Sequence, residues 1–253
     1  MDSVSASGVG VLDKAVTILA VLAERGPLGL ADLVHETGLA RPTVHRLAVA
    51  LERQGLAGRD DAGRFRLGAR LVAWGSQAAV ALVSGRALVE AAGPVLAELR
   101  DATDESAQLY VRDHGTRVCV AVAERSSGLR DTVPVGAVLP LTAGSGAKVL
   151  LAWRDRREPL PPGVDPGELA AVRRRGFASS VAEREPGVAS VSAPVFDGEG
   201  RLVAAVSVSG PVERLGRRPG ARFATTVLAA ARQLEGRAGL IADTERRGGR
   251  GVR

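Results

Sequence analysis

The chain has little of several residue types on which whole classes of protein depend. Its 253 residues include one cysteine, three histidines and 3% aromatic residues. The single cysteine, Cys119, excludes an internal disulfide, and three histidines that lie far apart give no spacing of metal ligands. We therefore expect neither a metal nor a bound cofactor.

Long apolar runs and a signal peptide are lacking as well. Because a membrane-spanning helix needs about 20 consecutive apolar residues, we expect no membrane partner and a cytoplasmic location. The stretch "AGSGAK" lacks the Gly-Lys-Ser/Thr ending of a P-loop and the first glycine of a nucleophile elbow. The sequence therefore favours a protein that is not an enzyme.

Lysine is nearly absent, and arginine takes its place. Only Lys14 and Lys148 among the 34 basic residues are lysines, so arginine carries the net charge of +6. Arginine suits phosphates and guanine edges, but a GC-rich coding genome enriches it too, and composition alone does not separate these interpretations. Seven arginines lie within 41–70 against three acidic residues, which concentrates the charge on one structural unit.

The N-terminal part has the apolar spacing of three short helices. Apolar residues recur at helical intervals over 11–25 and 30–37, and Gly38 suits the tight turn that follows. The third helix is expected to begin at Pro42, which costs no hydrogen bond at a first helical position. Its inward stripe is Val44, Leu47, Ala48 and Leu51.

The other side of the third helix has the character of an anion site. It carries Pro42, Arg46, Val49 and Arg53. Arg41 is a poor N-cap, so backbone N–H groups of the first turn stay free for a phosphate. His45 is either a phosphate contact or an ordinary surface histidine.

A short hairpin follows the third helix. An Asp-Asp-Ala-Gly turn joins two strands in which Phe65 and Leu67 alternate with Arg64 and Arg66. Three helices and a basic hairpin predict a winged helix-turn-helix, with the third helix in the major groove and the wing along the backbone of DNA. The candidate DNA contacts are Arg41, Pro42, Thr43, His45, Arg46, Arg53, Arg64 and Arg66.

Beyond residue 70 the periodicity changes from helical to alternating. Expected helices cover 71–83, 86–103, 167–175 and 221–240, and expected strands cover 106–113, 117–124 and two segments within 190–210. This order suits a largely antiparallel sheet covered by helices, an α+β fold. Trp74 is a large ring to leave in water, so we expect the linker helix to pack in a dimer.

A fixed order of long motifs runs through the chain. They include "VLDKAVTILAVL", "GLARPTVHRLAVALERQGL", "GRFRLGARL", "PVGAVLPLTAGSGAKVLLA" and "RRRGFASSVAEREPGVASVSAPVFD". With these blocks the sequence resembles the IclR family of bacterial transcriptional regulators. The resemblance implies a winged helix-turn-helix over 1–70, a linker helix over 71–85 and a GAF-like effector-binding domain over 86–245. The residues "RRGGRGVR" themselves predict a basic flexible tail over 246–253. It also implies a homodimer or homotetramer that binds double-stranded operator DNA as a repressor, an activator or both, in response to a small-molecule effector.

A narrower likeness lies in "ESAQLYVRD", "ERSSGLRDTVPVG" and "EREPGVASVSAPV". These stretches resemble the actinobacterial branch that controls leucine biosynthesis. Family effector pockets draw on the loop-to-helix block and the last two strands, and the positions that carry over are Leu139, Ser145, Gly146, Ser180, Ser190, Ser207 and Ser209. Ser180 departs from the pattern, because glyoxylate- and pyruvate-sensing relatives have an aspartate at the matching place.

The residues alone also point to a polar face in the second domain. Ser207 and Ser209 alternate with valines, which puts their hydroxyls on one side of a strand roughly 7 Å apart, and Ser190 and Ser192 do the same. Such serines are either ordinary cross-strand residues or the lining of a cavity. The Gly-rich turn before Lys148 opens a helix whose N–H groups favour a carboxylate, with Lys148 assisting or merely exposed. A stand-alone sensor or an enzyme built on this domain is the alternative class.

Overall fold

The computed structural model describes residues 7–82, 86–155 and 157–239. The chain divides between Ala78 and Ala79 into two compact units, called here the N-terminal and the C-terminal unit. The division falls within helix α4 (Ala69–Leu82), where the sequence predicts a linker. Five parts of the predicted domain scheme lie outside the described residues: 1–6, 83–85, 156, 240–245 and the predicted tail over 246–253.

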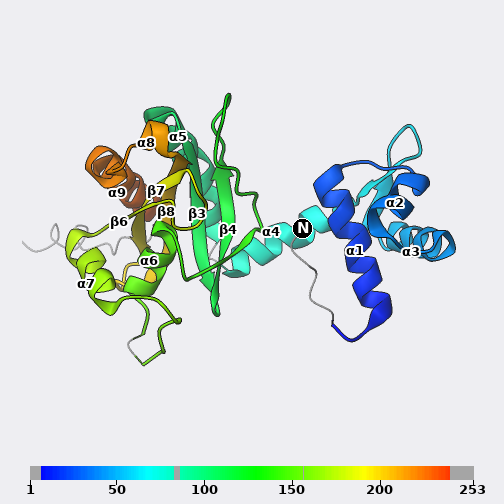
Figure 1. Ribbon diagram of the computed structural model, residues 1–253, viewed down its shortest axis with the longest axis horizontal. Coiled ribbons are helices and arrows are strands. Elements are labelled where there is room, and N and C mark those ends of the chain that lie inside the picture. Colours follow the sequence, from blue (N-terminus) through cyan, green and yellow to red (C-terminus); the bar gives the residue numbers. More distant parts are fainter. Residues whose placement is uncertain (1–6, 83–85, 156, 240–253) are drawn as a thin grey trace, which may run out of the picture. The chain divides into compact units, whose positions relative to one another are not determined.

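Three short helices form the body of the N-terminal unit (Figure 1). They are α1 (Gly10–Arg25), α2 (Leu30–Thr37) and α3 (Arg41–Arg53). Gly38 follows α2 with a φ of 65°, a left-handed conformation that favours glycine, and this turn leads the chain into α3. The inward stripe predicted for α3 is buried in a small apolar core that all three helices share.

A two-stranded hairpin completes the N-terminal unit. Strand β1 (Ala57–Arg59) pairs antiparallel with β2 (Phe65–Leu67), and a bridge between Leu28 and Phe65 ties the hairpin to the helices. Phe65 is buried in the same core as the helices. Three helices with a hairpin packed on them make a winged helix-turn-helix, as predicted.

The C-terminal unit is built on an antiparallel sheet (Figure 1). Among the described residues the sheet has six strands in the order β5-β4-β3-β8-β7-β6, and all neighbouring strands are antiparallel. The strands are β3 (Ser106–Asp113), β4 (Thr116–Ala123), β5 (Val138–Pro140), β6 (Ala178–Val181), β7 (Val188–Phe196) and β8 (Leu202–Pro211). The helices are α5 (Arg86–Thr103), α6 (Ser145–Ala152), α7 (Pro166–Arg175), α8 (Val212–Leu215) and α9 (Pro219–Arg237).

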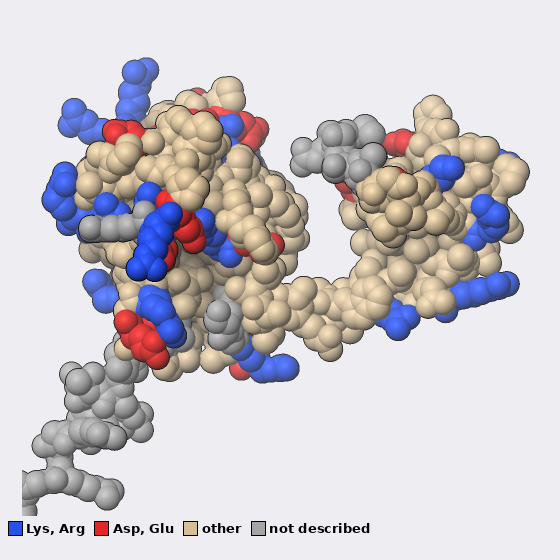
Figure 2. Space-filling view, turned by 90° about the horizontal axis from the view of Figure 1, so that it is seen from below, with Lys and Arg blue, Asp and Glu red and all other residues tan. Residues whose placement is uncertain are grey.

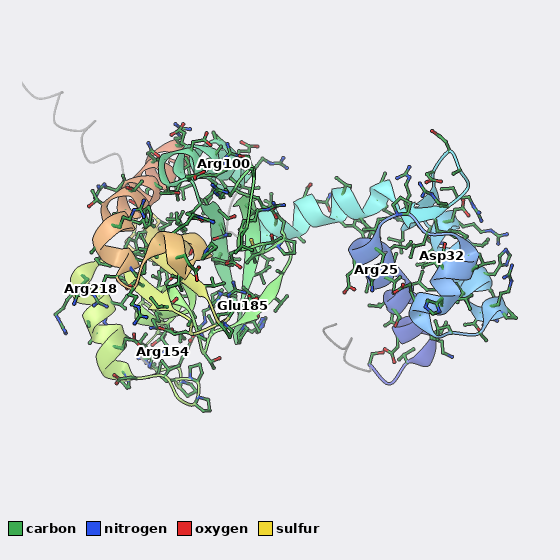
Figure 3. The ribbon with its side chains drawn as sticks, turned by 45° about the horizontal axis from the view of Figure 1, so that its top comes forward. Arg25, Asp32, Arg100, Arg154, Glu185 and Arg218 are labelled. Atoms are coloured by element: carbon green, nitrogen blue, oxygen red, sulfur yellow. The ribbon has the colours of Figure 1, made fainter. Side chains whose placement is uncertain are left out.

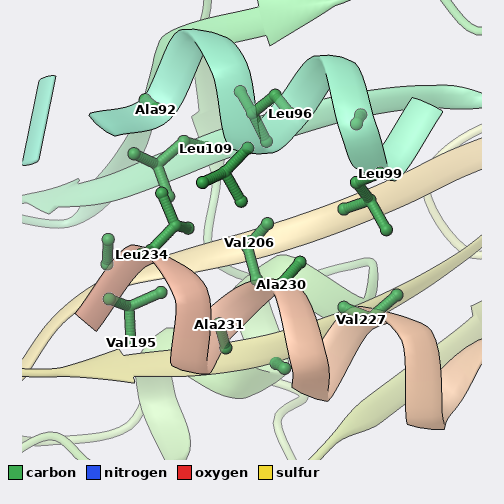
Figure 4. Close-up of a cluster of buried hydrophobic side chains, with 14 of the residues drawn as sticks. Ala92, Leu96, Leu99, Leu109, Val195, Val206, Val227, Ala230, Ala231 and Leu234 are labelled. Atoms are coloured by element: carbon green, nitrogen blue, oxygen red, sulfur yellow. The ribbon is translucent and has the colours of Figure 1, made fainter. Parts of the chain in front are cut away.

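Helices cover both faces of this sheet. Helices α5 and α9 pack on one face over a large apolar core, and Figure 4 shows Leu96 of α5, Leu234 of α9 and Val206 of β8 gathered in it. Helices α6 and α7 cover the other face over a second apolar core. These layers confirm the α+β fold with a GAF-like antiparallel sheet that the sequence predicts.

The sequence does not predict three elements of the C-terminal unit: β5, β6 and α8. Each is three or four residues long, which is too short to display a period of alternation or of helical spacing. The predicted start of the last helix is late by two residues, because α9 begins at Pro219. Proline is favoured in a first helical turn, so this residue was the signal for the correct boundary.

Helix α4 is exposed along its length. None of its described residues is buried, and Val72 and Trp74 are 72% and 48% exposed. No single helix among the described residues is long and apolar enough to cross a membrane, whereas α4 and α5 together, as a bent pair, satisfy the criteria of length and composition. One member of that pair, α5, is largely buried in the apolar core of the C-terminal unit.

Candidate nucleic-acid interface and ligand cavity

The side of α3 that faces away from the core is basic. Among the candidate DNA contacts on this helix, Thr43 is half-buried and the exposed residues are Arg41, Pro42, His45, Arg46 and Arg53. The ion pairs found among the described residues of this unit use Arg25, Arg59 and Arg64. The three arginines of α3 therefore keep their charge available for a polyanion. Figure 2 shows several blue side chains on the face of this unit that it draws.

The start of α3 differs from the prediction in one respect. The helix begins at Arg41 with Ala40 as its N-cap, one residue earlier than expected. The N–H groups of Thr43 and Val44 donate to the Ala40 carbonyl at 2.9 and 3.1 Å, and Pro42 has no N–H. The first turn therefore has fewer free N–H donors than predicted, and a phosphate at this place must rely more on side chains.

The two wing arginines that the sequence proposes as equivalent differ in their partners. The Arg64 side chain forms an ion pair with Asp60 at 2.8 Å. The Asp60 carboxylate also accepts a hydrogen bond from the Arg64 backbone N–H at 2.8 Å, which closes the turn of the hairpin. Arg66 donates only to backbone carbonyls among the described residues, those of Arg59 at 3.4 Å and Leu67 at 3.2 Å. Arg66 therefore keeps an uncompensated charge, whereas the charge of Arg64 is offset.

A small polar cavity lies between the start of α6 and the sheet in the C-terminal unit. Its volume is about 20 Å³, enough for roughly one water molecule. Six of the seven predicted effector residues line it, namely Ser145, Gly146, Ser180, Ser190, Ser207 and Ser209. The strand register places these serines together, because Ser190 lies opposite both Ser180 and Ser209 on neighbouring strands.

The serine hydroxyls form a continuous hydrogen-bonded chain. Ser145 Oγ lies 2.6 Å from Ser190 Oγ and 2.7 Å from Ser192 Oγ. Ser180 Oγ lies 2.8 Å from Ser190 Oγ, and Ser192 donates to Ser207 at 2.9 Å. Ser192, which the sequence places on the same face as Ser190 but not among the effector contacts, therefore connects Ser207 to Ser145 and the rest of the chain.

Two N–H groups at the N-terminus of α6 already have side-chain partners. The Gly144 N–H donates to Glu183 Oε2 at 3.2 Å, and the Ser145 N–H donates to Ser180 Oγ at 3.2 Å. Lys148 is not part of the cavity lining and forms ion pairs with Glu168 at 2.6 Å and Glu183 at 2.5 Å. The carboxylate predicted for this helix end is thus supplied, in part, by the protein's own Glu183.

Four residues that the sequence does not single out bring charge and an aromatic ring to the cavity. They are Tyr110, Arg117, Asp131 and Arg184. Arg184 Nη2 donates to both oxygens of Asp131 at 2.7 Å. Arg117 is 3% exposed and lies with its guanidinium carbon 5.3 Å from the centre of the Tyr110 ring. The position of Arg117 in an otherwise small and apolar strand was the one sequence signal for it.

Burial governs the titration of the groups around the cavity. It raises the pKa of the Tyr110 hydroxyl and lowers the pKa of Arg117. It also raises the pKa of the Cys119 thiol to about 12, and this side chain packs in the apolar core beside the cavity. No group of three or more His, Cys, Asp or Glu is placed to hold a metal ion in the part of the chain that the structure describes.

Leu139 stands apart from the other predicted effector residues. It lies on β5 opposite Arg117 of β4 and packs, half-buried, against the apolar core under α6 and α7. The lining of the 20 Å³ cavity does not include it. Its effector contact stays a prediction, and the structure gives it a packing role beside Arg117.

A winged helix-turn-helix with an unpaired basic face, in one chain with an α+β unit that contains a polar cavity, is the architecture of a ligand-responsive DNA-binding regulator. Two family models match the chain: the IclR helix-turn-helix domain over residues 11–61, and the C-terminal domain of bacterial transcriptional regulator IclR over 80–159 and 166–235. The chain belongs to the IclR family of bacterial transcriptional regulators.

Individual relatives agree with this assignment. The regulator BhcR of Paracoccus denitrificans is 31% identical over 245 residues, which cover 90% of this chain and 86% of that protein. The glycerol operon regulatory protein of Streptomyces coelicolor is 33% identical over 231 residues, 84% of this chain and 89% of that protein. The crystal structure of Thermotoga maritima IclR matches the fold with a TM-score of 0.71 at 21% identity, over 91% of this chain and 99% of that one.

Proposed function

We propose that the chain acts in the cytoplasm as a regulator that binds double-stranded operator DNA through α3 and the β1-β2 hairpin. The observation that carries this proposal is the position of Arg41, Arg46 and Arg53. They are exposed, unpaired in the described part of the unit and opposite a fully apolar side of the same helix. Such a face attracts phosphates by charge and reads bases by bidentate contacts.

The regulator binds DNA as a homodimer or a homotetramer. Support comes from α4, whose exposed Trp74 and Val72 would otherwise leave a large apolar area in water. The α1 helix adds exposed apolar side chains, namely Val11, Leu12 and Val16. Two-fold symmetry also matches two recognition helices to two half-sites about one helical turn apart.

The C-terminal unit binds a small carboxylate-bearing metabolite in the cavity under α6. Two arginines against one aspartate in the lining give the site a net positive charge, which favours an anion. The absence of an acidic side chain at Ser180 has the same effect. An intermediate or product of branched-chain amino-acid synthesis is the first candidate.

The genes under control are those of leucine biosynthesis. This proposal rests on the motifs "ESAQLYVRD", "ERSSGLRDTVPVG" and "EREPGVASVSAPV". The relatives described above have names that refer to other functions, such as the glycerol operon, and so lend the leucine proposal no support. Regulators of this fold differ in target through a few base contacts, so overall similarity is a poor guide to the operator.

Genome-wide mapping of bound DNA, followed by titration of the purified protein on the recovered sites, tests these proposals together. The expected result is a palindromic site upstream of leucine genes, bound by a dimer that dissociates or tightens when the correct acid is added. Sites at unrelated genes would remove the leucine assignment alone. A purified protein that binds no DNA would favour the alternative, a stand-alone sensor or enzyme on the C-terminal unit.

A further inference from the structure

The effector cavity contains a buried cation that the protein leaves mostly without partners. Arg117 is 3% exposed, and its Nη1 donates to the Ala143 carbonyl at 2.8 Å. Among the residues that the structure describes, Arg117 Nε is the one buried side-chain nitrogen or oxygen with no hydrogen-bond partner. A guanidinium has five N–H donors, so most of the hydrogen-bonding capacity of Arg117 is unused within the described chain.

The surroundings hold this guanidinium in place without neutralising it. The Tyr110 ring lies 5.3 Å from it, and a Cβ at Gly144, where φ is +90°, would come within 3.3 Å of Arg117 Nη2. Asp131, the acidic residue of the cavity lining, is engaged by Arg184 through both of its oxygens. A buried charge without a counter-ion is costly, which makes Arg117 a strong site for an incoming anion.

The serine hydroxyls do not supply free donors for that anion. Each hydroxyl has a single donor hydrogen. All of these hydrogens can point in the same direction along the chain, and the last hydroxyl, that of Ser207, donates to the Val191 carbonyl at 3.4 Å. Ser209 exchanges hydrogen bonds with the Gln108 amide at 2.9 and 3.2 Å. The order along the chain is Ser180, Ser190, Ser145, Ser192 and Ser207. The serine wall therefore presents lone pairs, which accept hydrogen bonds.

We propose that the effector is a small hydroxy acid, whose carboxylate binds Arg117 and whose hydroxyl donates to the serine chain. This inference rests on the proposed function, because it takes the cavity under α6 as the effector site. It assigns the carboxylate to the unused guanidinium donors of Arg117, which bring a positive charge to the cavity. At the start of α6 the N–H groups of Gly144 and Ser145 already have partners, and within the described part of the chain the N–H of Gly146 stays available as a second donor.

Entry of such a ligand requires the cavity to widen. Its volume of about 20 Å³ holds roughly one water molecule. An open cleft of about 470 Å³ shares two lining residues with it, Asp131 and Val188. Asp131, held by Arg184, therefore borders both the cleft and the cavity.

Calorimetry of the full-length protein with matched small acids tests the ligand class. The hydroxy-acid probes are glycolate, lactate and malate. Their counterparts without the hydroxyl are acetate, propionate and succinate, and lactamide is the counterpart of lactate without the charge. We expect a hydroxy acid to bind roughly tenfold or more tightly than its counterpart, because the missing hydroxyl removes a hydrogen bond to the site. Lactamide should bind least, because it loses the charge that pairs with Arg117. Equal binding of acids with and without the hydroxyl, or no binding by any probe, overturns the inference.

Variants of two arginines on neighbouring strands test the role of Arg117. Arg117→Gln should weaken binding of the best acid roughly ten- to hundredfold, and Arg117→Lys should retain part of it. Arg112→Gln is the matched control, because Arg112 lies opposite Arg117 in the register, pairs with Glu158 and is not part of the cavity lining. Equal losses in both glutamine variants would overturn the assignment of Arg117.

Two further measurements keep the outcomes distinct. Should Arg117→Gln fail to fold, as judged by its melting transition, the comparison of acids on the wild-type protein decides the inference. Operator binding without added acid is measured in parallel for every variant. Loss of the acid response with intact operator binding leaves the regulator assignment in place, whereas a wild-type protein without operator binding removes the proposed function itself.

Discussion

The two units of the chain use arginine in opposite ways. In the N-terminal unit Arg41, Arg46 and Arg53 stand on the exposed side of α3, away from the core. In the C-terminal unit Arg117 is buried beside the sheet and Arg184 holds Asp131 at the edge of a cavity. On the face drawn in Figure 2, blue and red side chains lie side by side on the C-terminal unit. We therefore expect the position of an arginine relative to the core, and not the composition of the unit, to decide which kind of anion it binds.

The difference has consequences for the strength and the salt dependence of binding. An exposed arginine acts through water and is screened by ions beyond a Debye length of about 8 Å at physiological ionic strength. A buried arginine acts at a lower effective dielectric constant and is screened far less. One arginine of the C-terminal unit should therefore contribute more to its small ligand than one arginine of α3 contributes to DNA.

The largest expected effect separates the two kinds of site by salt. Between 50 and 200 mM salt, operator affinity should fall by roughly 10³-fold or more if a dimer neutralises at least six phosphates. Affinity for the bound acid should change by only about twofold, because its partner is buried. Fluorescence anisotropy on operator DNA and calorimetry with the acid measure both on one preparation. If the affinities for operator DNA and for the acid fell by the same factor, the contrast between the two sites would be wrong, and the acid would bind at an exposed site.

The next largest effect is expected at Arg46, which we propose to contact one base. Arg46→Ala should weaken specific operator binding by about 1–3 kcal/mol, roughly five- to 150-fold, and relax the base preference at one position. Arg25→Ala is the control, because Arg25 is an exposed arginine of the same unit that pairs with Glu36 near the end of α1 (Figure 3). Electrophoretic mobility shifts on operator and random DNA are the measurement. Similar losses in both variants would indicate a general charge effect without base reading.

The sequence predicts the secondary structure of the N-terminal unit closely because its signals are local. Gly38 marks the turn before α3, and the apolar spacing around Val44 and Leu47 marks the buried side of that helix. The ion pair of Arg64 with Asp60 is not predictable in this way. It depends on how the hairpin turn folds back, and the alternation of Arg64 with Phe65 gives no information about that geometry.

The residues of the cavity likewise fall into some that the sequence predicts from local signals and others that depend on tertiary packing. Alternation with valines is enough to place Ser207 and Ser209 on one face of a strand, and the structure brings both to the cavity lining. The sequence does not identify Arg117 as a cavity residue, because charged residues are rarely buried. Its alternation with Val118 indicates only that the two side chains lie on opposite faces of the strand. The pairing of Asp131 with Arg184, which lie far apart in the sequence, follows from tertiary packing alone.

A smaller effect should distinguish the two wing arginines. Arg66→Ala should lower the slope of log affinity against log salt by about 0.9, the value for one lost phosphate contact. Arg64→Ala should lower it less, because Arg64 pairs with Asp60 before any DNA arrives and must give up that partner to bind a phosphate. Salt titrations on random DNA measure both slopes without a contribution from base contacts. Equal slopes for the two variants would show that the ion pair opens freely on DNA.

The smallest functional effect is expected at Cys119, a buried group two residues from Arg117 on the same strand. Burial raises the pKa of its thiol from an ordinary value of 9.0 to about 12, and the thiolate is the reactive form. Ellman's reagent at pH 8 should therefore label the unfolded protein at once and the folded protein hardly at all.

The folded state keeps the thiol proton of Cys119 more firmly than the unfolded state. The stability that depends on this group is therefore fully present below about pH 9 and is lost as the pH rises toward about 12. Cys119→Ala should flatten that part of the pH profile without altering DNA affinity. Rapid labelling of the folded protein at pH 8 would mean that the core beside the cavity opens to solvent, and would end the contrast between a buried and an exposed anion site.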